Sequence, residues 1–221
     1  MTCYYQGCTA KGTTTEHVPP KAFFPKDERL QLLTVKACPA HNTGKSQDDL
    51  YALAQICMNA SPSNRAREVW ITSVAPQLKH KQGALRKMIA EGAVQVGKGV
   101  AYRVDIGRLD AFFTALSLGL ICASKKAQLP TEYVIGHIYH SLTAADGSSD
   151  PFAASIESFY YGKPVTVMDF GKADLKNERI YSAEIHGMPD FGGSISIVHL
   201  FFGRFKVTSM LSLPRQVPAA M

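Results

Sequence analysis

Apolar residues follow two different spacings along the chain, and each spacing predicts a different kind of element. Residues 13–18 and 30–37 are rich in β-forming side chains, so we expect two strands there. A helix is expected over residues 39–58, where apolar residues recur three to four positions apart. Its apolar positions are Leu50, Leu53, Ala54, Cys57 and Met58. The first 60 residues therefore predict two strands followed by a helix.

Beyond residue 60 the pattern predicts helices, then a hairpin, then strands. We expect helices over residues 64–92, 107–126 and 130–143, and a hairpin over residues 92–106 around a Gly-Lys-Gly turn. From residue 155 to 213 the chain is rich in Val, Ile, Tyr and Phe between turn residues, which is typical of antiparallel strands. The predicted strands cover residues 158–162, 165–170, 180–187 and 194–211.

These patterns predict an α+β protein with two units. The first is a ββα module over residues 1–60, and the second is a mixed helical and antiparallel-strand domain over residues 61–221. The turn-rich residues 59–64 are the expected boundary. With 46% hydrophobic residues the chain can build a core, so a globally disordered protein is excluded.

Cysteine usage and the N-terminal sequence together indicate a reducing compartment. There are five cysteines, and the first residues, MTCYYQGC, lack the basic and apolar regions of a secretory signal. Metal ligation is then a better explanation of some cysteines than a disulfide framework. The apolar run 111–123 is too short to span a bilayer and predicts a buried helix. We expect a cytoplasmic protein with no membrane partner.

Two pairs of metal-binding residues flank the predicted strands. Cys3 and Cys8 form a C-x4-C pair, and Cys38 and His41 form a C-x2-H pair at the expected start of the helix. Thiolate and imidazole ligands in two such pairs suit Zn²⁺, so we predict a structural zinc site. One alternative is two unrelated thiols and a surface histidine. Another has His41 at a second metal, with zinc held by the three cysteines and another group.

A second set of reactive residues lies inside this frame. Glu16 and His17 come just before two prolines, which would end the first strand and leave both side chains at its rim. A neutral His17 can act as a general base on water. Oxygen ligands from Glu16 and Asn42 suit a hard divalent ion such as Mg²⁺ or Mn²⁺. Lys45 is placed to meet a phosphate.

These stretches, EHVPP and LLTVKACPAHNTGKSQDDLY with the leading C-x4-C, resemble HNH endonucleases of the zinc-containing ββα-metal class. The resemblance covers about residues 1–50. It departs from the family pattern in three places: His41 stands for a cysteine, Glu16 for an aspartate, and the family's middle asparagine falls near Leu33 or Thr34. Adjacent strand residues point to opposite faces, so Glu16 and His17 can share a site only if the strand ends or bulges there.

The resemblance implies a metal-dependent endonuclease that hydrolyses phosphodiester bonds in DNA. His17 would activate the attacking water, and Glu16 and Asn42 would ligate the catalytic divalent metal. Cys3, Cys8, Cys38 and His41 would hold the structural zinc. Each site would nick one strand, so efficient double-strand cleavage needs a homodimer. The alternative is a non-catalytic zinc module that binds nucleic acid or a partner protein. Analogy at the level of the fold alone suggests a partner protein in a defence or mobile-element system.

The charge of the chain is uneven and favours nucleic acid as a partner. The net charge is +6, and residues 61–104 alone carry a net +6. We expect Arg86 and Lys87 there, with Lys21 and Lys45 in the module, to contact phosphates. The other interpretation of the basic excess is an ordinary solvated helix face.

The remaining reactive or aromatic residues favour structural roles. Cys57 and Cys122 lie in apolar runs and are expected to be buried thiols. His137 and His140 fall on the predicted helix 130–143 and suit a surface or an interface. A last group is expected to be structural or to pack in the core: His186, His199, Trp70 and the aromatic residues 159–161.

Overall fold

A computed structural model describes residues 1–29, 32–60, 63–142, 155–156, 165–170, 180–187 and 193–214. The predicted strand 158–162 lies outside these residues. The described chain is mixed α and β, as the sequence predicts, and its sheets are antiparallel.

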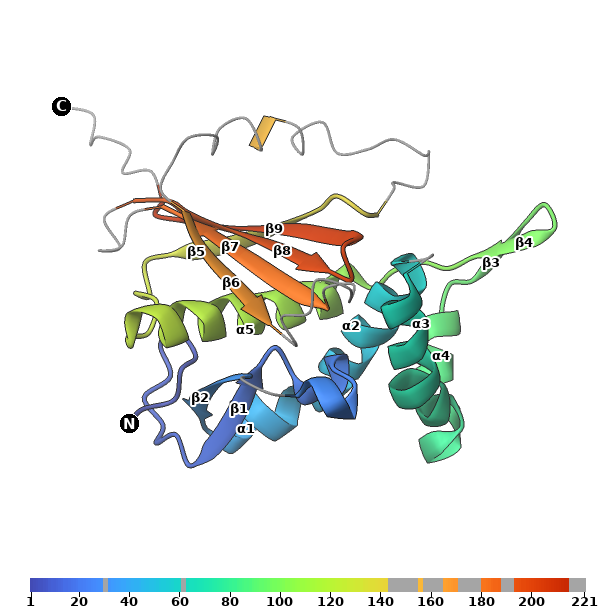
Figure 1. Cartoon of the computed structure of the whole chain (residues 1–221), viewed down its shortest axis with the longest axis horizontal. Coiled ribbons are helices and arrows are strands. Elements are labelled where there is room, and N and C mark those ends of the chain that lie inside the picture. Colours follow the sequence, from blue (N-terminus) through green and yellow to red (C-terminus); the bar gives the residue numbers. More distant parts are fainter. Residues whose placement is uncertain are drawn as a thin grey trace.

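The fold has three layers, with one long helix in the middle (Figure 1). The upper layer is an antiparallel sheet in the order β5-β9-β8-β7-β6. Its strands are β5 (Val134–Tyr139), β6 (Val165–Phe170), β7 (Tyr181–His186), β8 (Ile195–Phe201) and β9 (Phe205–Ser212). Helix α5 (Ile106–Lys125) lies under this sheet, and the N-terminal strands and helices lie below α5.

Helix α5 forms as its sequence predicts. The side chain of Asp105 caps it by accepting a hydrogen bond from the Arg108 N–H at 3.2 Å, and Lys126 ends it in a left-handed conformation. By length and composition α5 is the one described helix that could cross a membrane, although most of it is buried inside the protein. The apolar run is thus the central helix of the core.

Aromatic side chains fill the layer between α5 and the sheet. Phe112 and Phe113 of α5 contact Phe201 and Phe205 of the sheet, and all four are buried. Phe23 enters the same cluster, with ring centroids 5.2 Å from Phe112 and 5.3 Å from Phe201. The apolar residues that follow the two prolines therefore anchor the end of the first strand in the core.

The N-terminal module begins with two paired strands and continues into a kinked helix. β1 (Thr14–Val18) pairs antiparallel with β2 (Leu33–Ala37). α1 (Pro39–Asn42) leads through a 3-10 turn (Thr43–Lys45) into α2 (Ser46–Asn59). The predicted helix 39–58 is thus present, with a bend at Asn42, where φ is −118° and ψ is −78°.

The module and the rest of the chain share one core. Buried residues from both sides of residue 60 form a single hydrophobic cluster. Gly119 of α5 lies so close to β1 that a Cβ there would come within 2.7 Å of a Val18 methyl group. The helix that ends at Asn59 and the helix that begins at Asn64 therefore contribute to the same core.

The predicted helix 64–92 is broken into short pieces. It comprises α3 (Asn64–Val69), a run of π and 3-10 turns over residues 70–83, and α4 (Ala84–Ala90). Lys81, Gln82 and Gly83 all have positive φ, which stops a helix from continuing through them. After α4 the predicted hairpin is present as β3 (Val94–Val96) and β4 (Gly99–Ala101).

The predicted helix over residues 130–143 is wrong. Residues 134–139 form strand β5 instead, which pairs with β9 along its whole length. Val134, Ile135, Ile138 and Tyr139 are β-branched or aromatic and suit a strand. His137 and His140, three residues apart, mimic a helical face, but their partners lie on β9, about seventy residues later.

Candidate metal centre and the Glu-His strand

Four residues from two separate segments meet to form a candidate metal centre. The ligand atoms of Cys3, Cys8, Cys38 and His41 all lie within 4.8 Å of one another. Cys3 and Cys8 come from the N-terminal knuckle, where Gly7 turns with φ at +69°, and the other two residues flank the start of α1. These are the four ligands that the spacing predicts.

The distances suit a tetrahedral ion. His41 Nδ1 lies 3.4 Å from Cys3 Sγ and 3.3 Å from Cys38 Sγ. Ligand atoms around a tetrahedral Zn²⁺ are separated by roughly 3.6–3.8 Å, given Zn–S near 2.3 Å and Zn–N near 2.1 Å. Burial lowers the pKa of His41, which favours the neutral imidazole that a metal needs. The group can hold a metal ion, and its three sulfurs and one nitrogen suit zinc.

Hydrogen bonds to residues outside the module, and one ring stack within it, support the candidate metal centre. Gln128, just beyond the end of α5, donates its amide to the carbonyl oxygens of Cys3 and Cys8. Gln6 donates to the carbonyl oxygen of Pro130 at 2.5 Å. The ring of Tyr5 stacks on His41 with a centroid separation of 4.0 Å and an interplanar angle of 2°. Nothing in the sequence pattern indicates the contacts of Gln6 and Gln128, because they join residues at least 120 positions apart.

Glu16 and His17 lie on a regular part of strand β1. Glu16 pairs with Val35 and His17 with Thr34, and the ladder continues to Val18 without a bulge. Their side chains therefore point to opposite faces. Glu16 is 6% exposed and faces the core, whereas His17 is only half-buried. A shared Glu-His site requires that the strand end or bulge at these residues, and it does neither there.

Glu16 belongs to a buried ion-pair cluster. Lys45 Nζ lies 2.8 Å from Glu16 Oε1 and 2.6 Å from Asp49 Oδ2. Burial raises the pKa of both carboxyls, and the Lys45 ammonium opposes that rise. The Tyr4 hydroxyl is buried beside them, with no hydrogen-bond partner among the described residues. A cavity of about 10 Å³ lies beside them, and the residues that line it include Tyr4, Glu16, Lys45 and His17.

His17 keeps its ring free on the other face of the strand. No hydrogen bond to its imidazole is found within the described parts of the chain. Its pKa is lowered, first by burial and then by the positive charge of Lys21. The imidazole is therefore neutral near pH 7 and able to accept a proton.

Asn42 lies at the bend between α1 and α2, next to β1. Its Nδ2 donates to the carbonyl oxygen of Thr15 at 3.3 Å, two residues before His17. This leaves the Asn42 Oδ1 without a partner among the described residues. Asn42 therefore contacts β1 at Thr15, two residues before His17, and no contact between Asn42 and His17 is found among the described residues.

The predicted phosphate contacts differ in their surroundings. Lys45 is held by two carboxylates and is largely buried, so its charge is not presented to solvent. Lys21, Arg86 and Lys87 are exposed and have no ion pair in the described structure. Arg65 pairs with Glu28 and Glu68, which removes it from the basic excess.

The residues expected to be structural are found in the core or next to it. Cys57 is buried and Cys122 half-buried, both outside the metal centre. His199 is fully buried, and its ring bonds to the hydroxyl groups of Tyr181, Ser117 and Ser209. His186 lies on β7, and Trp70 packs against the core. The aromatic residues 159–161 lie outside the described residues.

The chain was compared with protein-family models, curated proteins and solved structures, and nothing in any of the three matches it.

Proposed function

We propose that this protein is a metal-dependent endonuclease that hydrolyses phosphodiester bonds in DNA. The observation that supports this most is the four-residue metal centre, which joins the N-terminal knuckle to the start of α1. A zinc ion there would fix strand β1 against the following helix, and so fix His17 relative to Asn42. The resemblance of residues 1–50 to HNH endonucleases agrees with this arrangement.

His17 would act as the general base. Its ring is neutral near pH 7, is half exposed and has no hydrogen-bond partner among the described residues. A water molecule at the ring could therefore lose its proton to a ring nitrogen as it attacks phosphorus. Lys21 is exposed and close enough to lower the His17 pKa, so it would place positive charge beside the incoming phosphate.

The second part of the proposal is a catalytic Mg²⁺ or Mn²⁺ ion. Such an ion would stabilise negative charge on the leaving oxygen. In this structure Glu16 and Asn42 do not form a site for that divalent ion, because Glu16 is bound to Lys45 and faces the core. Glu16 could bind a metal only after Lys45 leaves it, so we assign no step to Glu16. Asn42 has no hydrogen bond to its Oδ1 among the described residues, so this oxygen remains available as a ligand.

The second candidate function is a zinc module that binds nucleic acid or a partner protein without cutting. The Glu16-Lys45-Asp49 cluster favours it, because two buried carboxylates around one ammonium form a satisfied structural unit. A binding module would keep the metal centre and the exposed cations but would not depend on His17.

Supercoiled plasmid separates the two functions. The protein is incubated with plasmid in Mg²⁺, in Mn²⁺, and without divalent ions, while plasmid binding is measured in parallel by gel shift. An endonuclease converts supercoiled plasmid to open circles only when the ions are present, and a homodimer would add linear product. Binding without cleavage in any ion contradicts the endonuclease and favours the binding module.

A further inference from the structure

We propose that the β3–β4 hairpin is an arm that enters the major groove of B-form duplex DNA. This inference deepens the proposed function and rests on it for the choice of DNA as substrate. It does not require that the DNA be cut.

The β3–β4 hairpin projects from the rest of the protein and packs against little of it. β3 and β4 pair Val94 with Ala101 and Val96 with Gly99, and they turn at Gly97, where φ is +58°. Every residue from 91 to 103 is exposed, and Figure 1 shows the two strands extending away from the helices. A lone two-stranded hairpin is marginally stable in water, so the core does not explain why it is there.

The apolar residues of the arm face solvent. Val94 is 57% exposed, Val96 61% and Val100 48%. Val94 and Val96 lie on one face of the arm and Val100, opposite Gln95, on the other, so each face offers apolar contact area to a partner.

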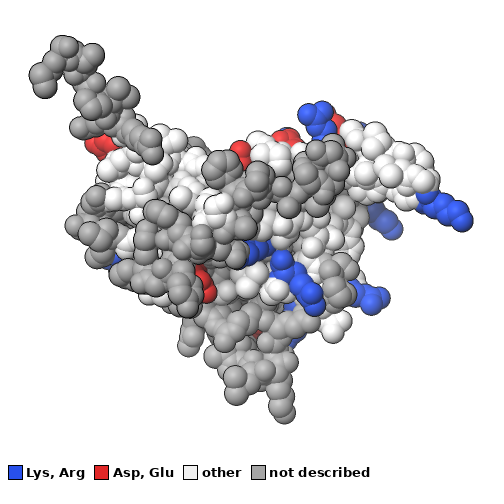
Figure 2. Space-filling view, turned by 90° about the horizontal axis from the view of Figure 1, so that it is seen from above, with Lys and Arg blue, Asp and Glu red and all other residues white. Residues whose placement is uncertain are grey.

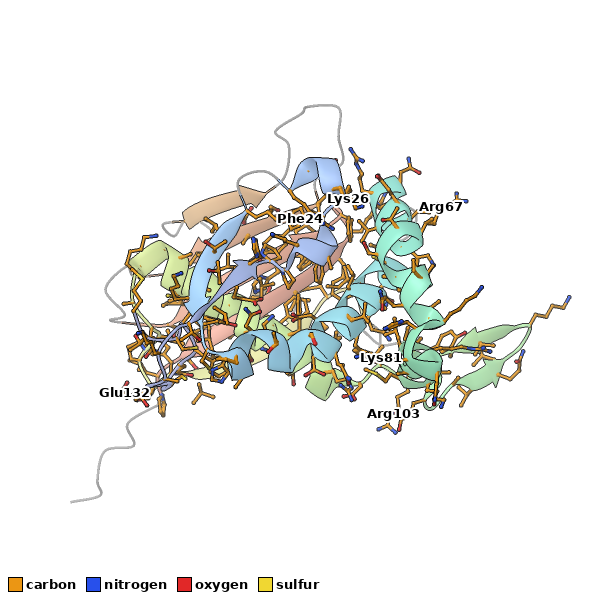
Figure 3. The ribbon with its side chains drawn as sticks, turned by 90° about the horizontal axis from the view of Figure 1, so that it is seen from below. Phe24, Lys26, Arg67, Lys81, Arg103 and Glu132 are labelled. Atoms are coloured by element: carbon orange, nitrogen blue, oxygen red, sulfur yellow. The ribbon has the colours of Figure 1, made fainter. Side chains whose placement is uncertain are left out.

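Charge identifies nucleic acid as the partner that suits the arm. Residues 92–104 contain Lys98 at the turn and Arg103 at the base and no acidic residue, while Glu91 and Asp105 flank the arm on the side of the body. Exposed cations without ion pairs in the described structure continue from the arm onto the neighbouring helices. They are Arg67, Lys79, Lys81, Arg86 and Lys87. Figure 2 shows most of the Lys and Arg on that face towards the hairpin end. In Figure 3 Arg67, Lys81 and Arg103 lie at one end of the molecule and Glu132 at the other.

The dimensions of the arm suit the major groove of DNA. Three residues per strand reach about 10 Å, and the groove is about 12 Å wide and 8.5 Å deep and admits a two-stranded ribbon. Valine methyl groups can contact thymine methyl groups there, while Lys98 and Arg103 meet phosphates. The major groove of A-form RNA is too narrow for side chains, so the arm should favour duplex DNA over duplex RNA.

Binding of labelled DNA and RNA duplexes of one sequence tests this, with no divalent ion added so that no cleavage intervenes. Three variants are compared with the wild type: Lys98→Ala, a shortened arm in which residues 95–100 become Gly-Gly, and the control Lys11→Ala. Lys11 is an exposed lysine of the N-terminal knuckle, away from the arm. Zinc content and thermal unfolding should be unchanged in all of them, because the arm packs on little of the body.

The shortened arm should bind DNA about tenfold more weakly and lose the preference for DNA over RNA, because its groove contacts are gone. Lys98→Ala should lower the slope of log affinity against log salt by about one, and Lys11→Ala should leave it unchanged. Equal DNA affinity for the shortened arm and the wild type overturns the proposal. Equal affinity together with a change from dimer to monomer would assign the arm to a second copy of the chain instead. Since these are binding measurements, failure of plasmid cleavage leaves the test of the arm intact.

Discussion

Lys45 is the residue whose surroundings differ most from what its sequence context suggests. An Asn-x-x-Lys spacing favours a phosphate contact, yet the ammonium lies between the carboxylates of Glu16 and Asp49. Its pairing with Asp49 is an i,i+4 contact and can be read from the sequence. Its pairing with Glu16 cannot, because it depends on how α2 crosses β1.

We expect Lys45→Met to destabilise the protein by about 3–5 kcal/mol at neutral pH, since it leaves two buried carboxylates without a cation. This loss of stability should become smaller as the pH falls, because protonated carboxyls need no cation. Burial already raises the pKa values of Glu16 and Asp49. Denaturant unfolding of this variant and of Lys36→Met, an exposed lysine on β2, measures the difference. Equal stability of the two variants would show that Lys45 is not bound in the cluster.

The candidate site was partly predictable at the residue scale. Cys3, Cys8, Cys38 and His41 stand in two short pairs, and the chemistry of one ion demands that such pairs meet. Glu16 and His17 were harder, because their relation depends on whether the strand bulges. The burial of the Tyr4 hydroxyl and the hydrogen bonds of Gln128 to the cysteine knuckle could not be predicted from the sequence, because both depend on contacts made only in the folded chain.

At the element scale, strands and helices with strong patterns were predicted and ambiguous ones were not. The long apolar run gave α5, and the Gly-Lys-Gly turn gave the β3–β4 hairpin. Residues 134–139 were wrongly predicted to be helical, because a short apolar run fits a helix or a strand until the neighbouring strand is known. Here the partner is β9, and the pairing decides for a strand.

His137 on β5 makes the contact between the sheet and α5 sensitive to pH. Its ring bonds to Thr114 Oγ1 at 2.9 Å and to Ser209 Oγ at 2.8 Å. Burial lowers its pKa to about 4, partly opposed by the nearby Asp110. Because an unfolded histidine titrates near about 6.5, the unfolded chain binds more protons between these values. Stability should therefore fall as the pH drops from about 6.5 to about 4.

The His137 contribution to that loss is up to about 3 kcal/mol. Denaturant unfolding at pH 7 and pH 4.5 should show a smaller loss for His137→Gln than for the wild type. The metal centre is present in both proteins, so its own pH dependence cancels in the comparison. If both proteins lose the same stability, His137 is not the group that titrates.

At the scale of the whole molecule, the metal centre is joined to one continuous hydrophobic core. The core runs through both sides of residue 60, and Gln128 joins the end of α5 to the cysteine knuckle. The sequence suggested two units because turn-rich residues 59–64 resemble a linker. It could not show that Gly119 lets α5 lie directly against β1.

We expect one zinc ion per chain and a general loss of stability without it. A structural zinc site contributes about 10–16 kcal/mol, whereas a typical domain is stable by only about 5–15 kcal/mol. Cys38→Ser should therefore lose its zinc and unfold at a much lower temperature, with faster hydrogen exchange in α5 as well as in residues 1–50. Cys122→Ser, which changes a cysteine outside the centre, should keep its zinc. Retention of zinc by Cys38→Ser, or loss of protection confined to residues 1–50, contradicts this.

The most direct test of the account is the initial rate of plasmid nicking by the wild type, His17→Ala and His80→Ala. His80 is an exposed histidine outside the site and serves as the matched control. A general base contributes about a hundred- to ten-thousand-fold in rate. We predict a loss of that order for His17→Ala in Mg²⁺ or Mn²⁺, with zinc content and DNA binding unchanged, and full activity for His80→Ala. Cleavage by His17→Ala at the wild-type rate would contradict the account.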